Sequence, residues 1–214
     1  AHWAIGLPWD VAFVLGAIVS PTDPVAATAI AGRLGAPRRF VTIVEGESLV
    51  NDATGLIVYK FAVAAVVTGS FSLAQAVGEF FLDAAGGIAI GLLTGFVIAA
   101  IRRRVEDAPT EITISLLTPY FAYLPAEALG LSAVLAAVTS GIYLGWRAPV
   151  LIAPETRLQA YSFWEIIVFI LNSALFVLIG LQLPGLVDAL GDSTVPSLIL
   201  DGLVLLAAVI AVRF

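Results

Sequence analysis

Glu45-Gly46-Glu47-Ser48-Leu49-Val50-Asn51-Asp52 is a polar stretch that lies between apolar runs, each long enough to cross a bilayer. It contains three carboxylates, an amide and a hydroxyl. A charged side chain within a transmembrane helix costs roughly 2.5–3.5 kcal/mol on insertion scales, so such residues are rare and usually functional. We therefore expect this stretch to hold a ligand inside the membrane.

The composition around this stretch is that of an integral membrane protein. Of the 214 residues, 60% are hydrophobic and 12% are charged, and the mean hydropathy is +1.04. Soluble domains are about 45–50% apolar and about 25% charged. Because the apolar runs are long and strand alternation is absent, we predict an all-α, multi-pass membrane protein rather than a barrel. Cysteine is absent, which excludes thiolate and disulfide chemistry.

Seven transmembrane spans are predicted from apolar length and from the Gly, Pro and charged residues between the runs. They cover residues 9–31, 42–67, 73–101, 110–129, 132–146, 159–183 and 196–214. The fourth and fifth spans have the weakest support, because Pro119, Pro125 and Glu127 interrupt the pattern in this region.

The loop charges support this number of spans. Arginines follow every second span, at positions 33, 38, 39, 102, 103, 104, 147 and 157. The other loops, at 68–72, 124–131 and 184–195, contain neither Lys nor Arg. The positive-inside rule then places the N-terminus of this chain outside and its C-terminal end in the cytoplasm, across the plasma (inner) membrane.

A second polar motif, Ser20-Pro21-Thr22-Asp23-Pro24, falls in the middle of the first span. Each proline removes an N–H and clashes with the preceding turn, so the helix should break at 20–24. Bare backbone groups at membrane depth are tolerated only where they line a polar cavity. We expect Thr22 and Asp23 to project into that cavity. The alternative is a kinked helix in which Asp23 caps the second half.

The two motifs together offer oxygen ligands. Ser48 and Asp52 are four residues apart and share one helix face. With Thr22 and Asp23 they form a set of oxygens that suits a small alkali cation, since hard cations prefer oxygen ligands. A carboxylate among apolar helices that binds either a proton or a cation, but not both, is sufficient for exchange. The alternative is that these groups only hydrogen-bond neighbouring helices.

Charged residues elsewhere within the spans need partners. An unpaired buried charge is far more costly than a pair, so we predict a structural ion pair between Glu47 and Arg213, which lies within the last span. Lys60 has three possible arrangements: it pairs with Glu45, pairs with Glu165, or extends to the membrane interface. The roles of Lys60 and Glu165 stay open.

These motifs resemble the monovalent cation:proton antiporters of the sodium/proton exchanger family. Thr22-Asp23-Pro24 and the later Glu47-Ser48-Leu49-Val50-Asn51-Asp52 form the most specific match. Phe176-Val177-Leu178-Ile179-Gly180 and Arg213 match in order and spacing, and the resemblance covers essentially the whole chain. It implies a fold of about 12–13 spans with inverted repeats and crossed, broken helices.

The resemblance also implies roles for individual residues. Asp52 would be the carboxylate shared by the proton and the cation. Asn51 stands where electrogenic relatives have a second Asp, which implies electroneutral exchange. Glu47 and Arg213 match the structural ion pair of the family. The implied Na⁺ (or Li⁺, or K⁺) ligands are Asp52, Asp23, Ser48 and Thr22.

The domain organisation follows from the same resemblance. Residues 1–68 would belong to the ion-transport core, 69–105 to a long linking helix, 106–190 to an interface bundle and 191–214 to the start of a second core repeat. The N-terminal helices and the second broken helix of the family are not seen, so we expect a piece of a longer protein. The expected partners are membrane lipid, the transported ions and a second copy of the chain. Neither a cofactor nor a nucleic acid is expected.

Two other classes of function use the same carboxylates. An intramembrane aspartyl protease would pair Asp23 with Asp52, but Asp23 lies between two prolines and Asp52 lacks a Gly-x-Gly-Asp context. A cation channel is disfavoured because no repeated, carbonyl-rich filter sequence is present. We therefore expect a transporter that is not an enzyme. The ligand set leaves Na⁺, Li⁺ and K⁺ open, because selectivity depends on cavity dimensions.

Overall fold

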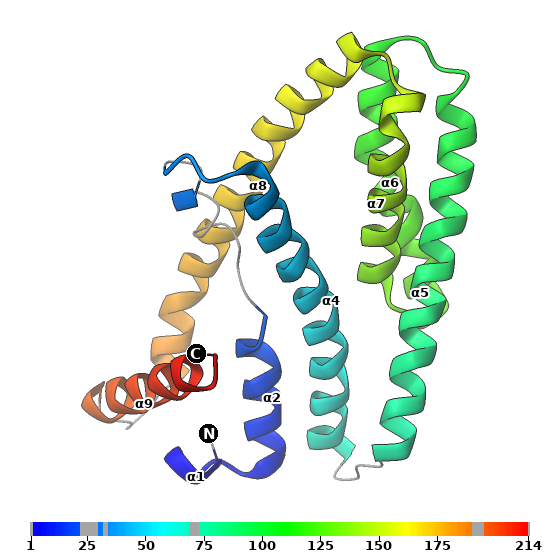
Figure 1. Ribbon diagram of the computed structural model, residues 1–214. Coiled ribbons are helices and arrows are strands. Elements are labelled where there is room, and N and C mark those ends of the chain that lie inside the picture. The colour runs from blue at the N-terminus through cyan, green and yellow to red at the C-terminus, as the bar shows by residue number, and fades with distance from the viewer. Residues whose placement is uncertain (1, 22–29, 32–33, 69–72, 190–194, 214) are drawn as a thin grey trace.

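The computed structural model describes residues 2–21, 30–31, 34–68, 73–189 and 195–213, and over this part of the chain it is helical without strands. The all-α prediction is thus confirmed. The helices are α1 (His2–Ile5), α2 (Trp9–Val19), α4 (Arg38–Thr68), α5 (Leu73–Arg102), α6 (Ala108–Ala128), α7 (Ala133–Leu151), α8 (Pro154–Ala189) and α9 (Val195–Arg213). Figure 1 shows their arrangement.

Length and apolar composition identify membrane-crossing helices among the described residues. Four are long and apolar enough to cross a bilayer: Arg39–Val67, Val77–Arg102, Ala133–Leu151 and Pro154–Val187. Two shorter apolar helices, Trp9–Val19 and Ile199–Ala211, lie in α2 and α9. Of the helices that fall in the seven predicted spans, α6 is in neither of these two groups, and it contains Pro119 and Pro125. A multi-pass helical membrane protein is therefore confirmed, with one described helix of α2 and α4–α9 in each of the seven predicted spans.

One predicted span was too short by several residues at both of its ends. The sixth span was expected over 159–183, whereas α8 runs from Pro154 to Ala189. Pro154 occupies the first position of the helix, where its missing N–H is not needed. Pro184 lies inside α8 and does not end it, because a membrane helix can re-satisfy the few backbone groups that a proline frees.

Helices α5, α6 and α7 form a tightly packed bundle (Figure 1). Small residues allow this approach: a Cβ added at Gly87 would meet the carbonyl oxygen of Ser132, and one at Gly91 would meet that of Ala136. The core of this bundle is built largely from buried alanines, Ala122, Ala126, Ala133 and Ala136. Backbones that lie this close gain van der Waals contact, which is the main force between helices in lipid.

The link between α5 and α6 is held by polar contacts. Arg102 Nε, at the end of α5, lies 2.5 Å from Glu111 Oε2 in the first turn of α6, and both side chains are buried. Asp107 caps α6 by accepting a hydrogen bond from the Thr110 N–H at 3.0 Å. Hydrogen bonds from the Thr110 side chain and backbone hold the pKa of Asp107 below its usual value. These contacts fix the angle at which the chain turns back.

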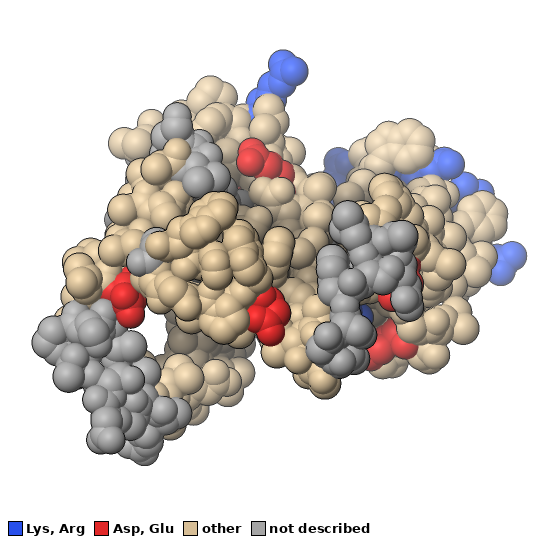
Figure 2. All heavy atoms as spheres, turned by 90° about the horizontal axis from the view of Figure 1, so that it is seen from below, with Lys and Arg blue, Asp and Glu red and all other residues tan. Residues whose placement is uncertain are grey.

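The other helices lie beside this bundle. α2 packs along α4, and the two meet the bundle mainly where α4 contacts α5 and α7. α8 begins against α6 and then leaves the bundle (Figure 1), so most of its large apolar side chains are exposed. The end of α5 and the start of α8 lie at the same end of the molecule (Figure 1). Seen from the opposite end, Asp and Glu are spread over the near face and Lys and Arg lie towards its edges (Figure 2).

We expect Gly91→Ala to destabilise the bundle. The new methyl group would meet the Ala136 carbonyl oxygen and lie 2.7 Å from Thr139 Cβ, and overpacking of this kind costs about 1–3 kcal/mol. The control is Gly180→Ala in α8, where a Cβ has open space. Thermal unfolding of the intact protein in detergent should show a lower Tm for Gly91→Ala alone. Equal Tm values for the two variants would contradict close α5–α7 packing.

Candidate functional site

The first span breaks where the prolines predict. α2 ends at Val19, and Ser20 caps it with its N–H bonded to the carbonyl of Gly16. Pro21 has no N–H, so the helical hydrogen bond to the carbonyl of Ala17 cannot form. Thr22, Asp23 and Pro24 lie outside the described residues, and their predicted part in a cation site stays a prediction.

Helix α4 packs directly against this break through a glycine. A Cβ added at Gly55 would lie 2.5 Å from Cγ of Pro21 and 3.5 Å from the carbonyl oxygen of Ala17. Only a residue without a side chain lets the helix approach so closely. The Ala17 carbonyl, which Pro21 cannot bond, therefore lies next to α4 at Gly55. Sequence reasoning missed Gly55, although a helical glycine one turn after the polar stretch is the signal that points to it.

A cavity of about 310 Å³ lies between the two helices at this level. Its polar lining comes from Ser20 at the end of α2 and from Asn51 and Thr54 on α4, and the rest is apolar. The Thr54 hydroxyl donates a 2.7 Å hydrogen bond to the Val50 carbonyl, so towards any further partner its oxygen can only accept. Hydroxyl, amide and carbonyl oxygens of this kind suit a hard cation or an ordered water.

The predicted ligands on α4 occupy neighbouring positions on the helix. Ser48 is buried, with 2% of its surface exposed, and Asn51 and Gly55 follow on the same stripe towards α2. Asp52 lies at the edge of that stripe, one turn after Ser48, and is exposed. The helix thus brings Ser48, Asn51 and Asp52 to one side of α4, and of these three Asn51 lines the cavity beside the end of α2.

The remaining predicted residues are placed as follows. Glu47 and Glu45 are exposed on α4. Arg213 is the last residue of α9, but its side chain lies outside the described part, so the Glu47–Arg213 ion pair stays a prediction. Lys60 and Glu165 are both exposed. Among the described residues no group of three or more His, Cys, Asp or Glu could hold a metal ion.

Comparison with known proteins identifies relatives over the whole chain. The family model described as "Sodium/hydrogen exchanger, transmembrane" matches residues 1–214. A sodium, potassium, lithium and rubidium/H⁺ antiporter of Bacillus subtilis is 42% identical over 201 residues, which are 90% of this chain and 30% of that protein.

Two further relatives show the same pattern. The low-affinity Na⁺/H⁺ antiporter NhaS1 of Synechocystis is 33% identical over 215 residues, which are 100% of this chain and 39% of that protein. An uncharacterized Na⁺/H⁺ exchanger of Mycobacterium tuberculosis, Rv2287, is 40% identical over 214 residues, again 39% of its length. The chain therefore spans roughly a third of these relatives.

We expect the α2–α4 cavity to be reached by water. The chain has no cysteine of its own, so Ser20→Cys introduces a single thiol at the cavity, and Ile18→Cys introduces one on a residue of α2 that is exposed but not part of the cavity lining. Thiols react as thiolates, which need a polar environment. A small, membrane-impermeant thiol reagent should label Ser20→Cys and leave Ile18→Cys unlabelled. Labelling of both or of neither would contradict a hydrated cavity.

Proposed function

The chain belongs to the sodium/hydrogen exchanger family, and from that premise we propose that the protein is a secondary transporter that exchanges a monovalent cation for a proton. The observation that carries the proposal is the polar side of α4, with Ser48, Asn51 and Asp52, of which Asn51 lines the cavity at the proline-broken end of α2. Elsewhere these two helices are largely apolar. Polar groups at membrane depth mark ion pathways.

Asp52 is the exchange group in this proposal. A carboxylate at membrane depth is costly when it is ionised and unpaired. Either a proton or a cation removes that cost, and each excludes the other because both occupy the same oxygens. Competition for one carboxylate therefore couples the two fluxes without further machinery.

The cation ligands are proposed to be Asp52, Ser48, Thr22 and Asp23. Ser48 is buried one helical turn from Asp52, so its hydroxyl belongs to the same face. Pro21 lies against α4 at Gly55. Thr22 and Asp23 follow Pro21 directly in the sequence, and their oxygens complete the ligand set in this proposal. Asn51 supports it from the cavity between the helices.

Alternating access is proposed to move this helix pair relative to the bundle. α2 and α4 pack along each other, and their contacts with α5 and α7 are far fewer. In this scheme residues 1–68 belong to the moving core and 191–214 begin its second repeat. Residues 69–105 and 106–190 form the support, through which two copies of the protein associate as a homodimer. The end at which α5 ends and α8 begins (Figure 1), which carries Arg102, Arg103, Arg104 and Arg157, faces the cytoplasm in this scheme.

Replacement of the exchange group provides the direct test. We expect Asp52→Asn in the intact protein to abolish cation-driven proton flux in proteoliposomes, because an amide cannot take up and release a proton. Na⁺, Li⁺ and K⁺ are added in turn between pH 6 and 9, which also ranks the ions. The control is Glu127→Gln at the far end of α6, an exposed carboxylate that should leave the flux unchanged.

Each contrary result has a defined meaning. Persistent flux in Asp52→Asn would exclude this residue as the exchange group. Cation flux without proton coupling in the wild type would indicate a channel. Absence of flux with every ion would leave the polar stretch as a network that only holds helices together.

The stoichiometry is proposed to be one cation per proton, since Asn51 supplies no second titratable carboxylate beside Asp52. Such exchange moves no net charge, so we expect its initial rate to be unaffected by membrane potential. Na⁺-driven proton flux is measured with a potassium gradient in the presence of valinomycin, and the same gradient without valinomycin is the control. A rate that changes with the sign of the potential would show that the exchange is electrogenic.

A further inference from the structure

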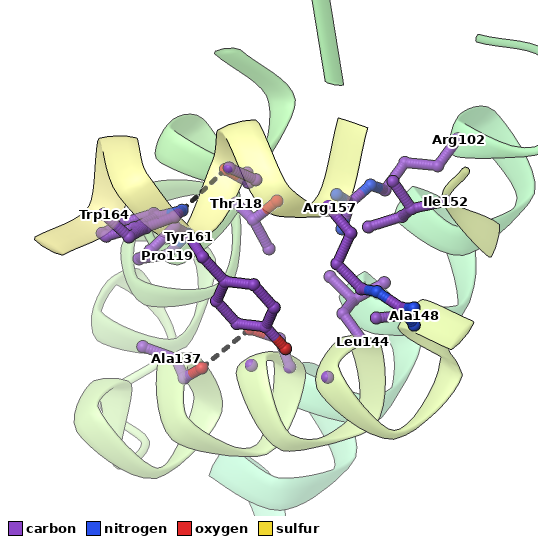
Figure 3. A pocket seen from close by; sticks show the side chains of 15 residues that line it. Arg102, Thr118, Pro119, Ala137, Leu144, Ala148, Ile152, Arg157, Tyr161 and Trp164 are labelled. Carbon is purple, nitrogen blue, oxygen red and sulfur yellow. Dashed lines mark hydrogen bonds between the residues drawn. The ribbon is translucent and has the colours of Figure 1, made fainter. Parts of the chain in front are cut away.

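A second cavity lies apart from the α2–α4 site, at the end of the molecule where α5 ends and α8 begins. Its volume is about 340 Å³, and its walls come from α6, α7 and α8 together with the end of α5. Figure 3 shows Arg157 and Tyr161 extending from α8 towards α7. Most of the lining is apolar, and the polar groups include two arginines.

The two arginines of the cavity, Arg102 and Arg157, differ in whether a carboxylate neutralises their charge. Arg102 donates through Nε to Glu111, so the charges of these two side chains cancel. A guanidinium has five N–H donors, and the bond to Glu111 uses Nε alone, which leaves the terminal N–H groups for a ligand. The Arg157 guanidinium makes no ion pair or hydrogen bond within the described residues. The cavity therefore carries one net positive charge with donors from two helices.

The apolar walls decide what kind of anion fits. Leu144, Ala148 and Ile152 line the same space as the arginines, and they give a small hydrated anion no hydrogen bonds. An anionic amphiphile fits both the charged and the apolar part of the lining. Its charged group would bind the arginines, and its hydrocarbon would lie along the apolar wall. One net positive charge matches the single charge of a phosphodiester.

The position of the cavity matches the headgroup layer. Arg102 ends one predicted span and Arg157 lies in the first turn of another, so both lie near a membrane surface. Tyr161 is 64% exposed at the cavity, and Gly141 and Gly145 are exposed on the facing side of α7, so the space opens sideways. Trp164 donates a 3.0 Å hydrogen bond to Ser115 Oγ and lines the cavity on the side away from the two arginines (Figure 3). Aromatic and basic residues together are typical of the lipid headgroup level.

We propose that this cavity binds the phosphodiester headgroup of an anionic phospholipid from the adjacent leaflet. Arg157 and the terminal N–H groups of Arg102 hold the phosphate, and the acyl chains extend out of the cavity between α7 and α8. Since α8 otherwise contacts the bundle mainly through α6, the bound lipid fastens the first turns of α8 to α5 and α7. This site is independent of the proposed cation site.

The test compares lipids that differ only in headgroup charge. The intact protein in detergent is titrated with phosphatidylglycerol or with phosphatidylcholine of the same acyl chains, and Tm is recorded. A ligand that binds the folded state raises Tm, and at equal concentration the tighter ligand raises it more. We expect phosphatidylglycerol to raise Tm more than phosphatidylcholine, and this difference to disappear in Arg157→Gln. The control is Arg103→Gln, an exposed arginine outside the cavity, which should keep the difference.

Native mass spectrometry gives an independent readout if the variant shifts the baseline Tm. Loss of one charged hydrogen-bond donor should weaken phosphatidylglycerol binding by about tenfold or more. Retention of full binding in Arg157→Gln, or equal effects of the two lipids on the wild type, would overturn the proposal. An equal stabilisation by millimolar inorganic phosphate would overturn the lipid assignment and indicate a soluble anion.

Discussion

Inside a bilayer, backbone N–H and C=O groups have no water to bond, and this constraint organises the described chain. Long helices such as α4, α5 and α8 satisfy their backbone groups internally. At the end of α2 the helix stops, and Pro21 leaves the Ala17 carbonyl without its helical partner. That break is packed against α4 at Gly55, beside the polar residues of α4. A backbone group freed by a proline and polar side chains of α4 are thus near one another, and the proposed cation site rests on this arrangement.

The helices are joined in two different ways. In α5–α7 the backbones touch through glycines and alanines, and a buried Arg102–Glu111 pair fixes the turn between α5 and α6. Removal of one member of such a pair costs about 3–5 kcal/mol, so this end of the bundle is rigid. Between α2 and α4 a cavity remains. The structure therefore contains a closely packed α5–α7 bundle and, beside it, the helix pair α2 and α4 with a cavity between them.

The sequence predictions that were correct depend on interactions within a few residues of the chain. The break after Ser20 was predicted because proline acts on its own helix, whatever surrounds it. The bounds of α8 were predicted poorly, because a membrane helix tolerates prolines and a charged first turn that would end a soluble one. Glu111 received no role from the sequence. Its partner Arg102 lies in the preceding helix, and only the turn between the helices brings the two together.

Residue order alone determined that the chain is helical, that it crosses a membrane, and that its polar residues gather near 20–24 and 45–52. Each of these follows from hydropathy, helical period or proline chemistry, which act over a few turns of chain. Tertiary structure decided that Gly55 meets Pro21, that Arg102 is neutralised by Glu111, and that Arg157 shares a cavity with it. Spacing along a helix sets the angle of a side chain about its axis, but the helix that it faces depends on packing between segments far apart in sequence.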